Sequence, residues 1–233
     1  MLPATPQREA VVTAIRRAVV LGELKPGDKL REVKLAATLG VSRPTLREAL
    51  NVLVQEGLLV QEPYRGFGVT ALDADSIRDI ARTRVPLDLI AVTAILDDPG
   101  GRRLQLVREA WERYAAVGPD ADPLARHEAH VALHRGLWEA SENSMLVRLW
   151  PVTEALTTIA LASDQATRDD SRRAHEVHRD LVDVILGRDR ARIEHELTRH
   201  TLDSAEELVA LQEREAPGVS DGPPRVRLHG AAC

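Results

Sequence analysis

The stretch LAATLGVSRPTLREALNVL, residues 35–53, decides the fold of the first part of the chain. Its apolar residues recur at helical spacing on both sides of a four-residue break, Leu39-Gly40-Val41-Ser42. Gly40 tolerates the left-handed backbone that ends a helix, and Ser42 is a good N-cap for the next one. Two helices joined by so short a turn, the second running to about Glu56, are typical of a helix-turn-helix.

The flanking sequence extends this unit on both sides. The first 22 residues carry apolar residues at helical spacing, and a short helix is predicted from Glu32 to Leu39. Residues 58–62 and 67–70 are short β segments around a turn that contains Pro63 and Gly66, which predicts a hairpin. Residues 1–72 are therefore predicted to form a winged helix-turn-helix.

The rest of the chain is predicted to be helical. Between short polar and Gly- or Pro-containing breaks, helical spacing predicts helices over 75–97, 101–116, 121–141, 144–163, 167–187 and 189–214. We expect an all-helical bundle over 73–216 and a disordered tail over 217–233. The predicted fold class is mainly α, with the small hairpin wing as its β part.

Composition excludes several classes of protein. The chain has 233 residues, of which 44% are hydrophobic but only 3% aromatic, so its core is aliphatic. The single cysteine, Cys233, excludes a disulfide framework and a multi-cysteine metal site. No apolar run reaches the roughly 18 residues of a membrane span, and no signal peptide is evident. We therefore expect a cytoplasmic protein with no membrane partner.

Charge is unevenly distributed, and basic residues gather where a helix-turn-helix contacts DNA. Residues 1–72 hold ten basic and seven acidic residues, while the remainder holds 21 basic and 29 acidic ones. Arginine at the start of a recognition helix reads guanine, threonine contacts a thymine methyl or a phosphate, and a basic wing reaches the minor groove or the backbone. The predicted DNA contacts are Arg31, Lys34, Arg43, Thr45, Arg47, Arg65 and Gly66. The alternative is an ordinary solvated helix face.

Four histidines of the bundle have spacings that suit one metal ion. His130 and His134 are four residues apart on one helix face. His178 lies nine residues before Gly187 and His200 thirteen after it, so antiparallel helices place them at about the same height. Four imidazoles favour zinc, nickel, copper or iron. The alternative is that these are ordinary core or surface histidines.

The head also carries three motifs together: LGVSRPTLREAL at 39–50, EGLL at 56–59 and RGFGV at 65–69. In these motifs it resembles the GntR family of bacterial transcription regulators, over nearly all of residues 8–70. The resemblance implies a homodimer that binds a palindromic operator in double-stranded DNA. Two departures affect the DNA contacts: many relatives have Thr-Pro or Gly-Pro in place of Pro44-Thr45, and many have arginine in place of Val33.

The body carries RVPLD at 84–88, HVALHRGL at 130–137 with ASEN at 140–143, and EVHR at 176–179 with Arg199-His200. These segments resemble the FadR-like branch, whose effector domain is called FCD. That domain binds a divalent metal, here zinc or nickel, through one Asp and three His. The resemblance matches the histidines to His134, His178 and His200 and puts His130 in the Asp position. With four neutral imidazoles, the charge of the ion stays uncompensated until an anionic effector binds.

Two further residues follow from the same resemblance. Arg84 matches a family arginine that faces the effector, and a guanidinium fork suits a small carboxylate. The alternative for Arg84 is a salt bridge with Asp88, one turn away. Asn143 also matches a family position, although capping of the helix that starts near Ser144 is its simplest role.

Together these observations predict a transcription regulator, a repressor, that responds to a small organic acid bound through a metal in the bundle. The chain is not expected to be an enzyme: no His-Glu-x-x-His motif is present, and no catalytic set accompanies the histidines. The alternatives are a metal-dependent enzyme or a structural metal bundle, either of them fused to a DNA-binding head.

Overall fold

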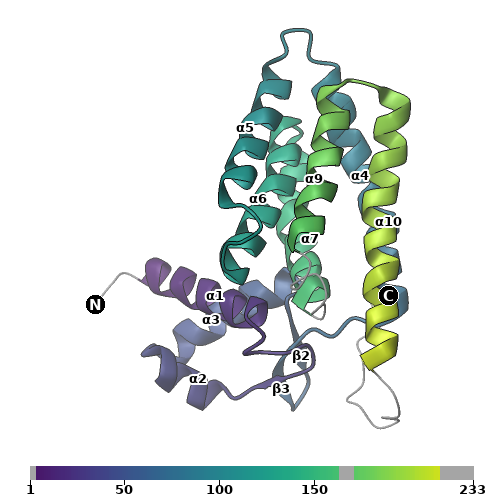
Figure 1. Cartoon of the computed structure of the whole chain (residues 1–233). Helices are drawn as coiled ribbons and strands as arrows, with labels where there is room; N and C mark the ends of the chain where they lie inside the picture. Colours follow the sequence, from purple (N-terminus) through teal and green to yellow (C-terminus); the bar gives the residue numbers. More distant parts are fainter. Residues whose placement is uncertain (1–3, 163–170, 216–233) are drawn as a thin grey trace, which may run out of the picture.

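The computed structural model describes residues 4–162 and 171–215 (Figure 1). Its head contains α1 (Ala4–Val20), α2 (Glu32–Leu39), α3 (Arg43–Gln55) and an antiparallel sheet. The sheet has the order β1-β3-β2, formed by β1 (Lys29–Leu30), β2 (Leu59–Glu62) and β3 (Gly66–Val69). The predicted fold class, a winged helix-turn-helix followed by a helical bundle, is confirmed.

Local sequence explains the turn of the helix-turn-helix. Gly40 has a φ of 64° and ends α2, while the Ser42 hydroxyl accepts a hydrogen bond from the Thr45 amide at 3.2 Å and caps α3. The strand β1 was not predicted, because two residues are too short to show a period. It pairs with β3, in the register Leu30 opposite Phe67.

Within the described residues, six helices form the body. Their bounds are α4 (Ala74–Leu96), α5 (Arg102–Val117), α6 (Pro123–Ala140), α7 (Ser144–Ala162), α9 (Ser171–Leu186) and α10 (Arg190–Glu215). Where the predicted end lies within the described residues, the bounds differ from the predicted spans by at most two residues. The carboxylates of Asp73 and Asp122 cap α4 and α6. The predicted start of the fifth of these helices at 167 and the predicted disordered tail, 217–233, lie outside the described residues. No helix in the described ranges is both long and apolar enough to span a membrane.

The hydrophobic core of the head continues into the bundle. Its buried residues, among them Ile15 and Leu50, form one cluster with Ile77, Ile159 and Val209 from the lower ends of α4, α7 and α10. The upper bundle has a separate core around Trp138 and Ile185. Head and bundle are therefore joined by shared apolar packing, and a change in the bundle can reach the head through it.

A close helix contact beside the histidines gives the first testable prediction. A Cβ added at Gly136 of α6 would lie 2.8 Å from the Cβ of Ala110 in α5. Ala110 cannot turn away, so Gly136→Ala is expected to destabilise the protein by about 1–3 kcal/mol, whereas this exchange in a helix is normally stabilising. Urea unfolding measures the change. The double variant Gly136→Ala/Ala110→Gly should recover most of the loss, and a stabilised single variant would contradict this packing.

Candidate functional site

The first candidate site is the DNA-binding surface formed by α2, the start of α3 and the wing. Arg31, Lys34 and Arg43 are all exposed there, and Arg43 is the first residue of α3. α2 and the wing lie on the side of the head turned away from the bundle (Figure 1). This placement leaves the start of α3 accessible to the major groove of a duplex.

Two of the predicted DNA contacts have partners within the head. Arg47 donates a hydrogen bond from Nε to Glu32 at 2.7 Å, and this bond raises the pKa of the guanidinium further. The hydroxyls of Thr45 and Ser42 lie 2.8 Å apart, within the helix cap. Arg47 is therefore held by α2 and Thr45 by the cap of α3, while Arg43 is exposed at the first position of α3.

The wing presents a residue that the sequence reasoning missed. Tyr64 lies fully exposed at the tip, with a φ of 62°, beside Arg65 and Gly66. Arg65 lies 3.6 Å from Glu62 across the turn. A tyrosine within a Pro-Tyr-Arg-Gly turn was the available signal, since an aromatic side chain there has no core to join. Val33 is 67% exposed on α2.

The second candidate site is the group of four histidines in the bundle. His130 and His134 project from α6, His178 from α9 and His200 from α10. The ring centroid of His178 lies 4.6 Å from that of His130, 5.2 Å from that of His134 and 4.8 Å from that of His200. The helical spacing of the four histidines thus predicted that their rings lie close together. We call these four residues the histidine cluster.

Three members of the histidine cluster form the tightest set. One ligand nitrogen from each of His130, His134 and His178 lies within 4.8 Å of the other two. His200 is outside that set, but it is buried, and its Nδ1 has no hydrogen-bond partner among the described residues. A buried nitrogen without a partner is costly unless something else binds it.

A chain of buried hydrogen bonds connects the cluster to the core. The indole of Trp138 donates to Oδ1 of Asp88 at 2.6 Å, and Nε of Arg84 donates to Oδ2 of the same carboxylate at 3.1 Å. A terminal nitrogen of Arg84 then lies 2.6 Å from Nδ1 of His134. Nε2 of His134 lies 3.1 Å from Nε2 of His178, whose Nδ1 lies 2.6 Å from the carbonyl of Ala174.

The environment keeps these imidazoles neutral. Burial lowers the pKa of all four, to about 4 for His178, and the positive charge of Arg84 acts in the same direction on each. Burial also raises the pKa of Tyr114, whose hydroxyl lies 3.5 Å from Nδ1 of His178, to about 12. Neutral imidazole is the form that binds transition metals.

The donor set fits a divalent transition metal. Two nitrogens bound to one tetrahedral zinc lie about 3.4 Å apart, given Zn–N bonds of about 2.0–2.1 Å. The facing Nε2 atoms of His134 and His178 are close to this separation. The contact of Nδ1 with the Ala174 carbonyl orients His178 in the way that outer partners orient ligating histidines. The unpaired Nδ1 of His200 adds a further donor nearby.

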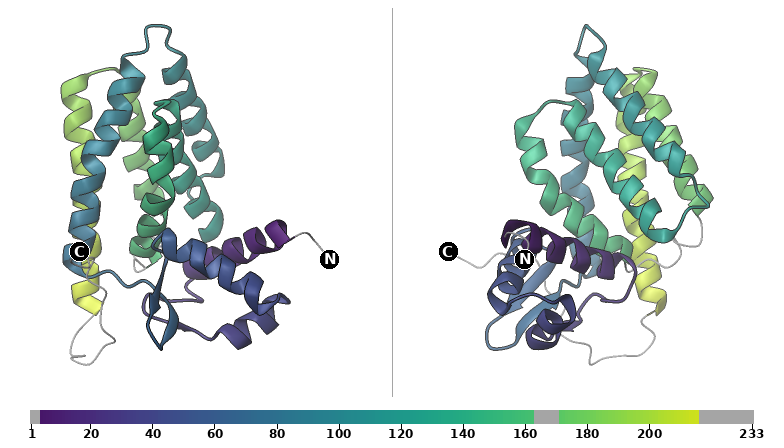
Figure 2. Two further views of the ribbon diagram at one scale, coloured as in Figure 1. Left: turned by 180° about the vertical axis from the view of Figure 1, so that it is seen from behind. Right: turned by 90° about the vertical axis from the view of Figure 1, so that its left-hand side faces the viewer.

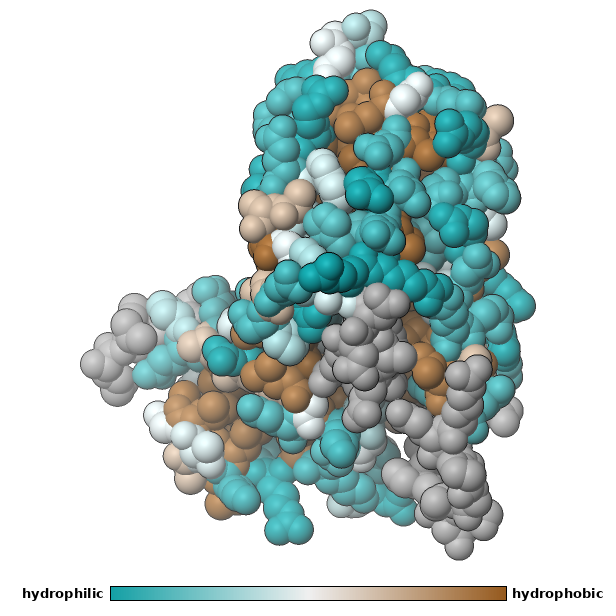
Figure 3. Space-filling model, viewed as in Figure 1, coloured by the Kyte–Doolittle hydropathy of each residue, from teal (hydrophilic) through white to brown (hydrophobic). Residues whose placement is uncertain are grey.

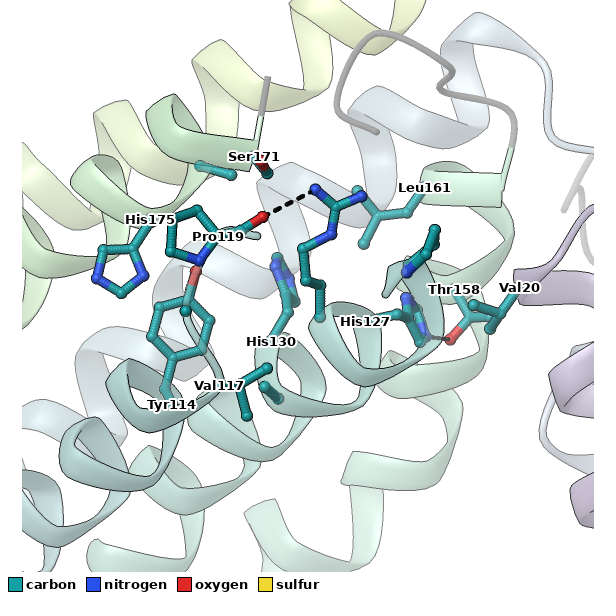
Figure 4. A pocket seen from close by; sticks show the side chains of 15 residues that line it. Val20, Tyr114, Val117, Pro119, His127, His130, Thr158, Leu161, Ser171 and His175 are labelled. Atoms are coloured by element: carbon teal, nitrogen blue, oxygen red, sulfur yellow. Dashed lines mark hydrogen bonds between the residues drawn. The ribbon is translucent and has the colours of Figure 1, made fainter. Parts of the chain in front are cut away.

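A cavity of about 90 Å³ adjoins the cluster through His130 (Figure 4). Apolar residues and polar ones both line it, and the polar ones are Tyr114, Arg126, His127, His130, Thr158, Ser171 and His175. Val20, the last residue of α1, also lines it, so the cavity is shared between bundle and head. Figure 4 shows Val20 next to Thr158 on one side and His130 toward the middle.

The two residues predicted to contact the effector are placed differently. Arg84 is buried against both Asp88 and His134, and it is not among the residues that line the cavity. The salt bridge with Asp88 is therefore present, and the contact of Arg84 with an effector stays a prediction. Asn143 accepts hydrogen bonds from the amides of Met145 and Leu146, so its side chain caps α7. The predicted helix cap is therefore present, and the contact of Asn143 with an effector stays a prediction.

The remaining histidines of the body are accounted for. His127 lies 3.2 Å from the hydroxyl of Thr158, and the His175 ring stacks on Tyr114 with centroids 5.3 Å apart. Both line the cavity, so they are candidates for contact with a ligand. His195 is exposed on α10 and separate from the cluster, which makes it a suitable control in experiments on the cluster.

The lowered pKa values predict how the stability of the metal-free chain depends on pH. In the unfolded chain His178 titrates near 6.5, whereas in the folded chain its pKa is about 4. Below about pH 6.5 the unfolded state binds a proton that the folded state excludes. The free energy of unfolding therefore decreases as the pH is lowered. For His178 alone the loss at about pH 5 is about 2 kcal/mol. Urea unfolding of chelator-treated protein measures it.

The control for this pH dependence is the exchange of His178 for a residue that does not titrate. His178→Gln should remove its share of the pH dependence, while His195→Ala, at an exposed site, should leave the dependence unchanged. Equal unfolding free energies for the metal-free wild type at about pH 7.5 and about pH 5 would contradict the burial of neutral histidines.

Comparison with known proteins gives the family. Residues 7–69 match "Bacterial regulatory proteins, gntR family" and residues 79–203 match "FCD domain". A relative from Paenarthrobacter nicotinovorans, named "Probable D-xylose utilization operon transcriptional repressor", is 31% identical over 199 residues, 83% of this chain and 86% of the relative. The transcriptional regulator YdhC of Bacillus subtilis is 28% identical over 62% of this chain and 56% of its own length.

Solved structures agree on the fold. E. coli McbR/YncC superposes with a TM-score of 0.70 at 20% identity, over 92% of this chain and all of that one. The matched families and relatives are transcriptional regulators, which confirms the prediction that the chain is not an enzyme. The chain belongs to the GntR family of bacterial transcription regulators and carries an FCD domain after its winged helix-turn-helix.

Proposed function

We propose that this regulator is a cytoplasmic repressor whose affinity for its operator is set by a small organic acid bound next to a metal ion in the bundle. Residues 1–72 bind DNA and residues 73–216 bind the effector. Arg43 reads a base, Arg47 and Thr45 support it, and Arg31, Lys34, Arg65 and Gly66 contact the backbone or the minor groove. Tyr64 adds a contact at the tip of the wing.

The observation that carries this proposal is the shared cavity. It touches the histidine cluster through His130 and the head through Val20. Thr158 and Leu161 of α7 line it as well, and Ile159 of the same helix belongs to the core that head and bundle share. An occupant that shifts α7 or the end of α1 therefore acts on the packing that holds the head in place.

The chemistry of the cavity defines the class of effector. A small apolar body is accommodated by the lining, and an acidic group suits the basic side chains of Arg126, His127 and His175. We assign His130, His134, His178 and His200 as the residues that would hold zinc or nickel. When bound, the ion supplies a positive charge that no carboxylate of the cluster balances, which favours an anionic ligand.

A second copy of the chain is the proposed partner of the α4–α7 face, and this dimer would match a palindromic operator. Met145, Leu149 and Val152 follow one another at helical spacing on α7 and are 39–57% exposed, and Ile90 of α4 is 49% exposed. α4 and α7 lie side by side in the left view of Figure 2. Figure 3, seen from the side of Figure 1, shows a largely hydrophilic bundle surface with hydrophobic patches near its top and over the head.

Operator selection followed by titration tests this function. The full chain is used to select its binding site from a random DNA library, and operator affinity is then measured with zinc and with a panel of small carboxylates. We expect a palindromic site and at least one acid that lowers operator affinity by about fivefold or more. Binding no tighter than to random DNA, or operator affinity that no acid changes, would overturn the proposal.

A further inference from the structure

Arg84 determines where the hydrogen of the His134 ring lies. An arginine side chain has only donors, so Nδ1 of His134, at 2.6 Å from Arg84, must accept. A neutral imidazole with an accepting Nδ1 carries its hydrogen on Nε2. That hydrogen points at Nε2 of His178, 3.1 Å away, and the hydrogen of His178 lies on Nδ1, which donates to the Ala174 carbonyl. The three hydrogen bonds therefore run in one direction: Arg84 donates to His134, His134 to His178, and His178 to the Ala174 carbonyl.

In this arrangement Nε2 of His178 can bind a metal directly, whereas Nε2 of His134 cannot. Nε2 of His178 carries a lone pair that faces the cluster, whereas Nε2 of His134 carries a hydrogen. For His134 to coordinate through Nε2, its hydrogen must move to Nδ1, where it meets the N–H of Arg84. Two donors cannot share a hydrogen bond. The terminal nitrogen of Arg84 therefore has to leave His134, with no net gain or loss of a proton.

We propose that Arg84 and the metal ion compete for His134, so that the metal and a carboxylate bind together. Once displaced, the guanidinium keeps its Nε bond to Asp88 but needs an acceptor for its terminal nitrogen. A carboxylate is the acceptor that fits a guanidinium fork. Its binding draws Arg84 from the ring and frees His134 for the metal. This inference rests on the proposed function, because it requires that the cluster binds a metal.

The local charge supports the same conclusion. Arg84 and Asp88 are both buried and balance each other in the metal-free protein. A divalent ion adds two positive charges beside Arg84, and the side chains that would bind it are neutral histidines with no carboxylate among them. Buried charges without partners are strongly unfavourable. An anion in reach of both the ion and Arg84 therefore stabilises the loaded site.

The test compares zinc affinity in charge-matched variants of the full chain. Arg84→Met combined with Asp88→Asn removes the competing arginine, preserves total charge and leaves an amide oxygen for the indole of Trp138. We expect this double variant to bind zinc about 10- to 100-fold more tightly than the wild type, the ratio that corresponds to one charge-assisted hydrogen bond. Arg82→Met with Asp79→Asn, an exposed pair on the same helix, is the control and should match the wild type.

Acetate serves as the carboxylate probe. Added acetate is expected to tighten zinc binding by the wild type, and to have a clearly smaller effect on the Arg84→Met/Asp88→Asn variant. Zinc affinities that are equal in the wild type and this variant would overturn the competition while leaving the proposed metal site intact. Equal effects of acetate on both would overturn the joint binding. Failure of every variant to bind zinc would overturn the metal site and this inference together.

Histidine tautomers give a readout that needs no variant. Nitrogen NMR of the wild type with labelled histidine reports which ring nitrogen carries hydrogen. We expect the hydrogen of His134 on Nε2 without zinc and on Nδ1 with zinc, while His178 keeps its hydrogen on Nδ1 in both states. A His134 ring whose tautomer is unchanged by zinc would overturn the proposal even if the double variant failed to fold.

Discussion

Replacing His178 by alanine is expected to weaken zinc binding by the full chain more than roughly 100-fold, beyond the 10- to 100-fold typical for loss of an outer partner of a metal site. His178 lies at the centre of the histidine cluster, with the rings of the other three within 5.2 Å of its own. Its Nε2 is the one whose lone pair already faces the cluster, because Nδ1 is held by the Ala174 carbonyl. Competition against a chromophoric chelator measures the affinity.

His195→Ala is the matched control for this prediction. His195 lies on the same helix as His200, but its side chain is exposed and outside the cluster. The control should bind zinc as the wild type does. If His178→Ala and His195→Ala both kept the wild-type affinity, zinc would be bound elsewhere on the chain and the assignment of the cluster would be wrong.

Replacing Arg43 by alanine is expected to lower the affinity for the selected operator by about 10- to 100-fold, the equivalent of about 1–3 kcal/mol for a bidentate contact with guanine. Arg43 is exposed at the first position of α3, the recognition helix, whereas Arg47 is tied to Glu32. The variant should also lose discrimination at one base pair in each half-site. Fluorescence anisotropy with operator and single-substituted duplexes measures both effects.

Lys34→Ala separates base reading from phosphate binding. Lys34 is exposed on α2, outside the recognition helix, and is expected to contact a phosphate. Its loss should weaken binding to all sequences alike and reduce the salt dependence by about one phosphate contact. A uniform loss for Arg43→Ala, with discrimination intact, would show that Arg43 also contacts only the backbone.

Helices and turns were the most predictable part of the structure. Apolar spacing and a strong cap at Ser42 are local features, so they predicted the helix-turn-helix and the helices of the body to within a few residues. The pairing of β1 with β3 depends on residues nearly 40 positions apart and could not be read from a period. The apolar core shared by head and bundle has the same origin, since sequence periodicity shows that Ile15 and Ile159 are buried but not that they meet.

The parts of the site that depend on helix geometry were predictable. The side-chain contacts were less so, because one side chain can bind any of several partners. Helix rise alone brought His178 and His200 to the same height, with rings 4.8 Å apart. The salt bridge of Arg84 with Asp88, one turn away, was predictable as a local contact. Its second contact, with His134, was not, because a guanidinium with several donors can serve two partners at once. The cap formed by Asn143 is local too and was predictable for that reason.

One measurement tests most directly whether the histidine cluster controls the head. Operator affinity of the full chain is determined with zinc bound and after removal by a chelator, for the wild type and for His178→Ala. We predict that zinc changes the operator affinity of the wild type by about fivefold or more, the range of typical coupling between two sites, and leaves His178→Ala unaffected. Identical operator affinities of the zinc-loaded and zinc-free wild type, with zinc shown to be bound, would contradict the account.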